Sequence, residues 1–269
     1  MIGVELVKML RRPRTWVTIA LLDSLPTLVA VLLALTELGP RPGTGPPFLS
    51  AVLADGTLFP LAALALVLPL FLPVAVAVMA GDSVAGEAQA GTLRYILVRP
   101  VGRTRLLVAK LVSIIAFVLL TVVVVAVTAY LVGALLLGDQ PLAATSVSGS
   151  ALTTQELFIR TLGAIAYVTL SMLGVAAIAL LLSTVTDSPL GAALGALAFL
   201  IASSVLLTLD AADSLRPYLP TRYWLAFADL FRDPVLWRDI VRGVALQGVY
   251  VAVFLAAAWA NFTTKDVTS

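Results

Sequence analysis

Apolar residues along the chain form long runs separated by short polar segments. Six runs are long enough to cross a bilayer, since a hydrocarbon core of about 30 Å needs roughly 20 apolar residues in a helix. The runs are continuous and lack the alternation of apolar and polar residues that is typical of membrane barrel strands. The pattern therefore predicts an all-α integral membrane protein, with one transmembrane domain (residues 1–269) folded as a six-helix bundle. The predicted spans are residues 16–36, 57–80, 106–137, 160–182, 190–209 and 241–260.

Composition supports a membrane protein and excludes much catalytic chemistry. Hydrophobic residues make up 61% of the chain and charged residues 12%, and the mean hydropathy is +1.07. Cysteine and histidine are both absent. Their absence removes disulfides, thiolate nucleophiles, imidazole bases and the commonest transition-metal ligands. We therefore predict no catalytic site and no metal site, and expect that the chain is not an enzyme by itself.

The positions of lysine and arginine predict the orientation. Cytoplasmic loops carry an excess of these residues. They cluster before the first span and again between the second and third spans. Both segments are therefore predicted to be cytoplasmic, and an even number of spans then places both termini there. Arginines in the 210–240 region oppose this topology, although aspartates in the same region nearly balance them. The two clusters comprise Lys8, Arg11, Arg12 and Arg14, and then Arg94, Arg99, Arg103, Arg105 and Lys110.

Residues 1–15 have the pattern of an amphipathic helix. Apolar residues such as Leu6 and Met9 fall near one helical face, and Glu5, Lys8 and Arg12 fall on the other. Such a helix is typical of the membrane interface. A basic tail that only sets the orientation of the first span is the alternative, and the sequence leaves both open.

Residues 81–105 form the longest charged and glycine-spaced segment between two apolar runs. Gly81 and Gly86 have the spacing that opens a phosphate-binding Walker A loop, but Glu87 stands where that loop needs a lysine. The sequence contains no complete Walker A motif, so ATP-driven work would need another polypeptide. A solvated connector that merely follows the positive-inside rule is the simpler interpretation from composition.

Several elements of this segment occur together and in order. They are Glu87, the Gly91-Thr92-Leu93 triplet, Pro100 followed by Arg103, and Lys110 at the start of the third span. The set resembles the first cytoplasmic loop of permease subunits of type 2 ABC exporters. The echo of an importer motif in Glu87-Ala-Gln-Ala-Gly91 is partial, and the exporter pattern fits better.

The resemblance implies an N-terminal elbow helix on the cytoplasmic leaflet and a short coupling helix that docks on a separate ATPase. Pro100 would end that helix. The residues that the resemblance assigns to coupling and docking are Glu87, Gly91, Thr92, Leu93, Arg94, Pro100 and Arg103.

The resemblance further implies a permease in a prokaryotic plasma or inner membrane that exports amphiphilic or lipophilic cargo, such as a drug, an antibiotic or a lipid-like molecule. The expected partners are ABC ATPase subunits, a second permease copy or paralogue and membrane lipid, with no nucleic acid. This chain would bind no cofactor, while ATP and magnesium would bind to the partner ATPase. An ion-coupled secondary carrier and a non-transporting membrane scaffold are the alternatives.

Three further features lie within or next to the spans. Asp23 is an ionisable residue inside the first span, and such residues mark function unless a neighbour satisfies them. Gly191 and Gly195 form a small-residue stripe suited to close helix packing, within the monomer or at a dimer seam. Residues 210–240 are too polar to span and rich in aromatics, and we expect them to form an extracytoplasmic cap with a short helix around residues 223–231.

Overall fold

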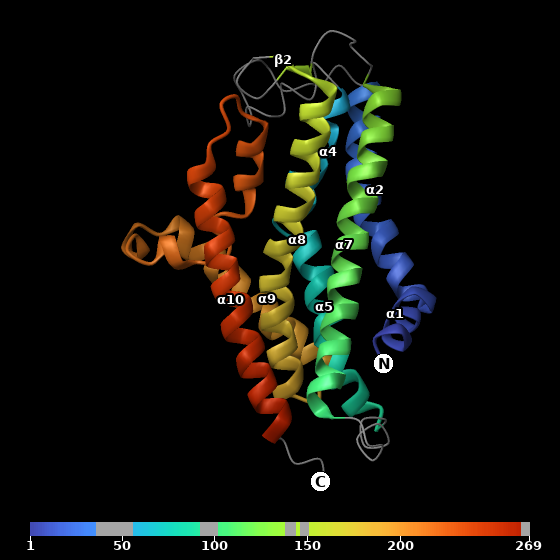
Figure 1. The fold of residues 1–269 in the computed structure, drawn as a ribbon, viewed down its shortest axis with the longest axis vertical. Helices are drawn as coiled ribbons and strands as arrows, with labels where there is room; N and C mark the ends of the chain where they lie inside the picture. The colour runs from blue at the N-terminus through green and yellow to red at the C-terminus, as the bar shows by residue number, and fades with distance from the viewer. Residues whose placement is uncertain (36–55, 92–101, 138–143, 146–150, 265–269) are drawn as a thin grey trace.

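The computed structural model describes residues 1–35, 56–91, 102–137, 144–145 and 151–264, and nearly all of them are helical (Figure 1). A two-residue antiparallel pair, β1 (Ala144–Thr145) and β2 (Ala151–Leu152), precedes α8 and pairs Ala144 with Leu152. In chain order the longer helices are α1 (Ile2–Arg11), α2 (Pro13–Leu35), α4 (Phe59–Val67), α5 (Phe71–Gln89), α7 (Arg103–Leu136), α8 (Thr154–Val185), α9 (Pro189–Thr208) and α10 (Trp237–Thr264).

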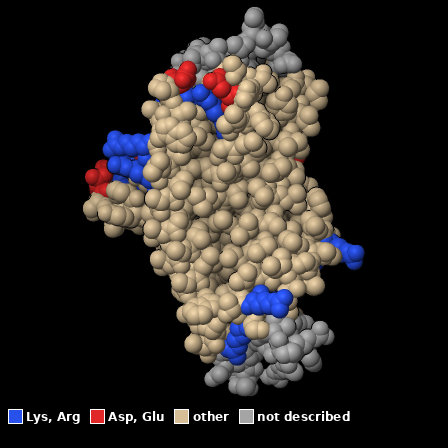
Figure 2. Space-filling model, viewed as in Figure 1, with Lys and Arg blue, Asp and Glu red and all other residues tan. Residues whose placement is uncertain are grey.

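Among the described residues, six helices are long and apolar enough to cross a membrane: α2, α5, α7, α8, α9 and α10. Their outer faces carry exposed side chains such as Leu21, Leu135 and Val253. On the face shown in Figure 2, the centre of the molecule is almost free of charged side chains, which lie toward its two ends and on groups that project at its left and right edges. The all-helical bundle with six candidate spans is confirmed, and it indicates a multi-pass membrane protein.

The second apolar run is broken into two helices. A 3₁₀ turn (η1, Gly56–Leu58) leads into α4, which ends at Val67, and α5 begins at Phe71. Pro69 lies in the break and Pro73 lies in the first turn of α5. Because Pro73 has no N–H, it cannot donate to the carbonyl of Pro69, and the regular ladder is interrupted there.

Helix α5 continues through Gln89, beyond the end predicted for the second span at residue 80. A close approach explains how this polar stretch is held as a helix. A Cβ atom at Gly81 would lie 3.0 Å from the backbone nitrogen of Ala193 and 3.2 Å from the carbonyl oxygen of Pro189. Glycine therefore lets α5 pack directly against the first turn of α9. The predicted loop over residues 81–105 thus begins as helix, and α7 begins at Arg103.

Helices α8 and α9 are joined by a tight turn at residues 186–188. Ser188 caps α9 by accepting a hydrogen bond from the backbone N–H of Gly191 at 3.1 Å, and Pro189 occupies the first turn. At its other end α8 starts with a capping box formed by Thr153 and Glu156. The two helices are antiparallel neighbours, and α8 packs against both α5 and α10.

The segment between α9 and α10 is built from 3₁₀ turns: η2 (Asp210–Ala212), η3 (Arg216–Tyr218) and η4 (Trp224–Phe231). The helix expected around residues 223–231 is found as η4, which buries Phe227 and Phe231 against α8 and α10. The part with η2 and η3, orange in Figure 1, projects sideways from the bundle. The η4 part of this segment therefore packs on α8 and α10, and the η2 and η3 part lies beside the bundle.

Candidate functional site

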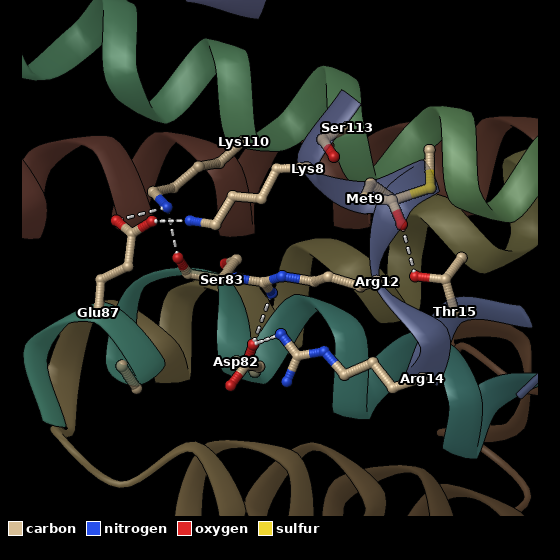
Figure 3. Close-up of polar contacts among 12 residues, drawn as sticks. Lys8, Met9, Arg12, Arg14, Thr15, Asp82, Ser83, Glu87, Lys110 and Ser113 are labelled. Atoms are coloured by element: carbon tan, nitrogen blue, oxygen red, sulfur yellow. Dashed lines mark hydrogen bonds and ion pairs between the residues drawn. The ribbon is translucent and has the colours of Figure 1, made fainter. Parts of the chain in front are cut away.

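A charged cavity lies between α1, the start of α2, α5 and α7. Its volume is about 420 Å³, and it mixes cationic, acidic and apolar side chains. The close-up in Figure 3 shows lysine and arginine side chains of α1, α2 and α7 converging on two carboxylates of α5. The charged residues that line it are Glu5, Lys8, Arg12, Arg14, Asp82, Glu87 and Lys110.

Glu87 is the centre of the first ion-pair group. Lys8 of α1 donates to Glu87 Oε1 at 2.6 Å, and the Nζ atom of Lys110 on α7 lies 2.7 Å from Oε2. Lys110 also donates to the carbonyl oxygen of Ser83 at 2.6 Å. The side chain of Lys110 is 2% exposed and that of Glu87 is 8% exposed. One buried carboxylate therefore joins three helices that are far apart in the sequence.

Asp82 is the centre of the second group. Arg12, between α1 and α2, lies 3.4 Å from Asp82 Oδ2, and Arg14 in the first turn of α2 contacts the same oxygen. This carboxylate is partly exposed. The arginines thus attach the α1–α2 corner to α5 one helical turn before Glu87.

Ser183 of α8 supports this part of α5 from the other side. Its hydroxyl donates to the carbonyl oxygen of Gly81 at 2.6 Å and accepts hydrogen bonds from the N–H groups of Val84 and Ala85 at 3.1 and 2.9 Å. Ser183 is fully buried. A side chain inserted into a helix ladder fixes its local geometry, so Ser183 positions the turn that carries Asp82.

Nearby charge and burial act in opposite directions on the pKa of Lys8. Burial lowers the pKa of this amine, but the hydrogen bond and negative charge of Glu87 outweigh burial, so the pKa lies above the ordinary value of 10.5. Lys8 is therefore a cation at every pH near neutrality. The geometry is suited to holding helices together and to binding an anion.

The predicted coupling residues other than Arg103 fall into three groups. Glu87 lies inside the bundle, as described above, whereas Gly91 is exposed and has a φ of 67°, a left-handed conformation that favours glycine and ends α5. Thr92, Leu93, Arg94 and Pro100 lie outside the described residues. The structure therefore describes both flanks of the predicted coupling helix.

Arg103 is the first residue of α7 and reaches the end of α10. Its guanidinium donates to the carbonyl oxygen of Thr263 at 2.9 Å and to that of Phe262 at 3.4 Å. Trp259 of α10 donates to the hydroxyl of Thr104 at 2.9 Å. Basic residues near a helix C-terminus satisfy its last carbonyls. Arg103 therefore ties the third span to the last one.

The intramembrane candidates find partners within the monomer. Thr128 of α7 donates to Asp23 Oδ1, so a neighbouring helix satisfies this carboxylate. Gly195 faces α8, since a Cβ atom there would lie 3.0 Å from Leu182 Cδ1. Gly191 is exposed beside the Ser188 cap. The structure thus shows packing within the monomer at Gly195.

Sequence reasoning missed Asp82, Arg14 and Ser183 as members of this site. Asp82 was visible as an acidic residue at the end of an apolar run, but nothing in the sequence pairs it with a residue 68 positions away. Ser183 gave no signal at all. Among the described residues no group of three or more histidine, cysteine, aspartate or glutamate side chains is placed to hold a metal ion.

A family model described as "Protein of unknown function (DUF2705)" matches residues 45–268, which is most of the chain. The chain belongs to this family. No curated protein matches it. The matched region of this DUF2705 member contains Asp82, Glu87 and Lys110, whereas Lys8, Arg12 and Arg14 precede it.

Proposed function

We propose that this chain is the membrane-spanning permease subunit of a type 2 ABC exporter, driven by a separate ATPase. One observation supports the proposal beyond the motif resemblance. Glu87 ties α1 and α7 to the end of α5 within the predicted coupling loop, residues 81–105, and just before residues 92–101 of that loop. Glu87 thereby joins the N-terminal helix, the second span and the third span beside the part of this loop on which an ATPase would dock.

The proposed mechanism follows from these contacts. ATP and magnesium bind to the partner ATPases, and their closure moves the 92–101 segment of each permease subunit. The movement enters α5 at Gly91 and α7 at Gly102, and the ion pairs of Glu87 carry it to α1. Amphiphilic or lipophilic cargo then crosses between two permease subunits, which are two copies of this chain or this chain and a paralogue.

This mechanism separates transmission from docking, and it adds Lys110 to the coupling residues predicted from the sequence. Glu87 and Lys110 are buried and act in transmission, because a side chain that is 8% or 2% exposed has little surface for a partner. Gly91, together with Thr92, Leu93, Arg94 and Pro100, would form the docking surface. In this proposal, the end of the bundle that faces the cytoplasm is the one that carries α1 and the C-terminal end of α10. Helix α1 serves as the elbow helix.

Copurification from the native membrane tests the proposal. The tagged full-length chain is solubilised gently, and its partners are identified by mass spectrometry. We expect an ABC ATPase with the wild type and with Glu87→Gln, and loss of the ATPase with Arg94→Glu. Arg238→Glu, an exposed change at the other end of the bundle, is the matched control and should retain the partner.

A second measurement separates docking from transmission. In reconstituted complexes, Glu87→Gln should keep the ATPase bound but reduce the stimulation of ATP hydrolysis by cargo. Absence of any ATPase, under conditions that preserve a known ABC complex, would contradict the proposal and favour an ion-coupled carrier or a scaffold.

A further inference from the structure

The charges that line the cavity between α1, α5 and α7 do not cancel. Four cationic side chains, Lys8, Arg12, Arg14 and Lys110, face three carboxylates, Glu5, Asp82 and Glu87. Counted over the described residues, the lining therefore carries a formal charge of +1. A single negative charge would neutralise it.

The pairing geometry locates this excess. Asp82 is shared by two guanidinium groups, and Glu87 is shared by two ammonium groups. Each carboxylate can neutralise one cation, so each group is left positive, and Glu5 compensates for one of them. Uncompensated charge is costly where water is scarce. Because Lys110 is 2% exposed, water offsets little of this cost at the floor of the cavity.

The surroundings of the cavity indicate the source of an anion that would neutralise this excess charge. Helix α1 turns Glu5, Lys8 and Met9 toward the cavity and exposes Val4, Val7 and Leu10 on the opposite side, with exposed fractions of 69, 48 and 43%. A helix with an apolar outer face and a charged inner face is suited to lipid. The cavity thus opens beside a helix with an exposed apolar face, and amphipathic helices of this kind lie at the membrane interface, where the phosphate groups of lipids are found.

We propose that this cavity binds the phosphodiester headgroup of an anionic phospholipid. Arg12 and Arg14, which are 34% and 48% exposed, are available to contact the phosphate from the open side, above the floor formed by Lys8, Glu87 and Lys110. Guanidinium groups bind phosphate oxygens in a bidentate manner. The volume of about 420 Å³ far exceeds the roughly 30 Å³ that one water molecule occupies in liquid, and it accommodates a headgroup.

The test uses the full-length protein in an uncharged detergent and does not involve the ATPase, so it is independent of the proposed function. The melting temperature is followed while a short-chain phosphatidylglycerol, a phosphatidylcholine of the same chain length, or inorganic phosphate is added. We expect stabilisation by phosphatidylglycerol and none by phosphatidylcholine. Equal responses to both lipids would overturn the proposal. Equal stabilisation by inorganic phosphate would overturn the lipid assignment and identify a site for soluble phosphate.

Two substitutions at one ion pair separate binding from folding. Arg14→Gln removes a positive charge from the lining and should weaken the affinity for phosphatidylglycerol about fivefold. Asp82→Asn removes a negative charge and should strengthen it by a similar factor. A merely structural pair predicts that both changes weaken binding, which would overturn the proposal. Arg11→Gln, an exposed change on α1 outside the cavity lining, is the control and should leave the affinity unchanged. If Arg14→Gln fails to fold, the direction of the change in affinity for phosphatidylglycerol in Asp82→Asn alone still tests the proposal.

Discussion

The two polar regions of the bundle are held by different interactions. At the end that carries α1, ion pairs join residues from distant parts of the chain, and Glu87 and Lys110 are buried. In the segment between α9 and α10, the ion pairs of Arg216 with Asp210 and Asp213 are local, and both aspartates are fully or mostly exposed. That segment is attached to the bundle mainly by neutral donors: Tyr167 donates to the carbonyl oxygen of Tyr223 at 2.6 Å, and Gln247 to that of Pro220 at 2.7 Å. One charged donor, Arg160 of α8, bonds to the carbonyl oxygen of Arg232 at 2.9 Å.

The difference shows how charge is used in this molecule. Irregular backbone beside apolar helices is tolerated when its carbonyls are satisfied by protein side chains, and neutral donors do this without burying a charge. Buried ions cost more, and their attraction repays the cost only when each has good partners. The charged end is therefore the region where binding of a ligand or partner would most change the electrostatic free energy of the bundle.

The largest expected effect is at Lys110. Lys110→Met removes one of the two described cations of the buried Glu87, leaving Lys8, and also removes a donor from the carbonyl of Ser83. We expect a loss of about 3 kcal/mol in the free energy of unfolding, measured by denaturant titration of the full-length protein in detergent. Lys110→Met combined with Glu87→Gln should recover most of the loss, because no buried charge is then left with too few partners. Arg105→Met, an exposed change on the same helix, is the control, and a Lys110→Met loss no larger than the control's would contradict the ionic interpretation.

A smaller loss is expected where attachment is uncharged. Tyr167→Phe removes the donor to the buried carbonyl of Tyr223 and should cost about 2 kcal/mol. Because no ion is involved, the loss should be the same in 0.1 and 1 M salt. A loss that falls with salt would show that the two regions do not differ as described. Ser171, one helical turn away on α8, bonds to its own helix at Tyr167, so Ser171→Ala is a matched control with a smaller expected effect.

The fold was more predictable than the site, and the reasons are physical. A membrane span is encoded locally by about 20 apolar residues, so all six were visible in the sequence. The break before α5 lies at Pro69 and Pro73, whose missing donors act locally. The pairing of Glu87 with Lys8 was not visible, because Lys8 lies 79 positions away and pairs with it only after α1 folds back on α5. Helix α5 extends beyond its apolar run because Gly81 and Ser183 contribute packing and hydrogen bonds that composition does not reveal.

Exposed ion pairs in the segment before α10 should contribute almost nothing. Asp213→Asn removes a pair in which the carboxylate is 79% exposed, and such pairs are weak and screened by salt. We expect the melting temperature to be unchanged within error, in contrast with a clear loss for Lys110→Met. A marked destabilisation by Asp213→Asn would show that this segment also depends on charge.

The smallest effect near neutrality is expected for pH. Lys8 has a pKa above 10.5 in the folded protein because the hydrogen bond and charge of Glu87 outweigh burial. The contact therefore contributes fully to stability below pH 10.5 and is lost as the pH rises through the raised value. Since the chain has no native cysteine, spin labels at Gly3→Cys and Val185→Cys, both exposed positions, report the distance from α1 to the bundle. That distance should stay constant from pH 6 to about 10 and widen above it, while the same pair in a Lys8→Met background should show no such transition; widening between pH 7 and 9 would mean that another group controls the position of α1.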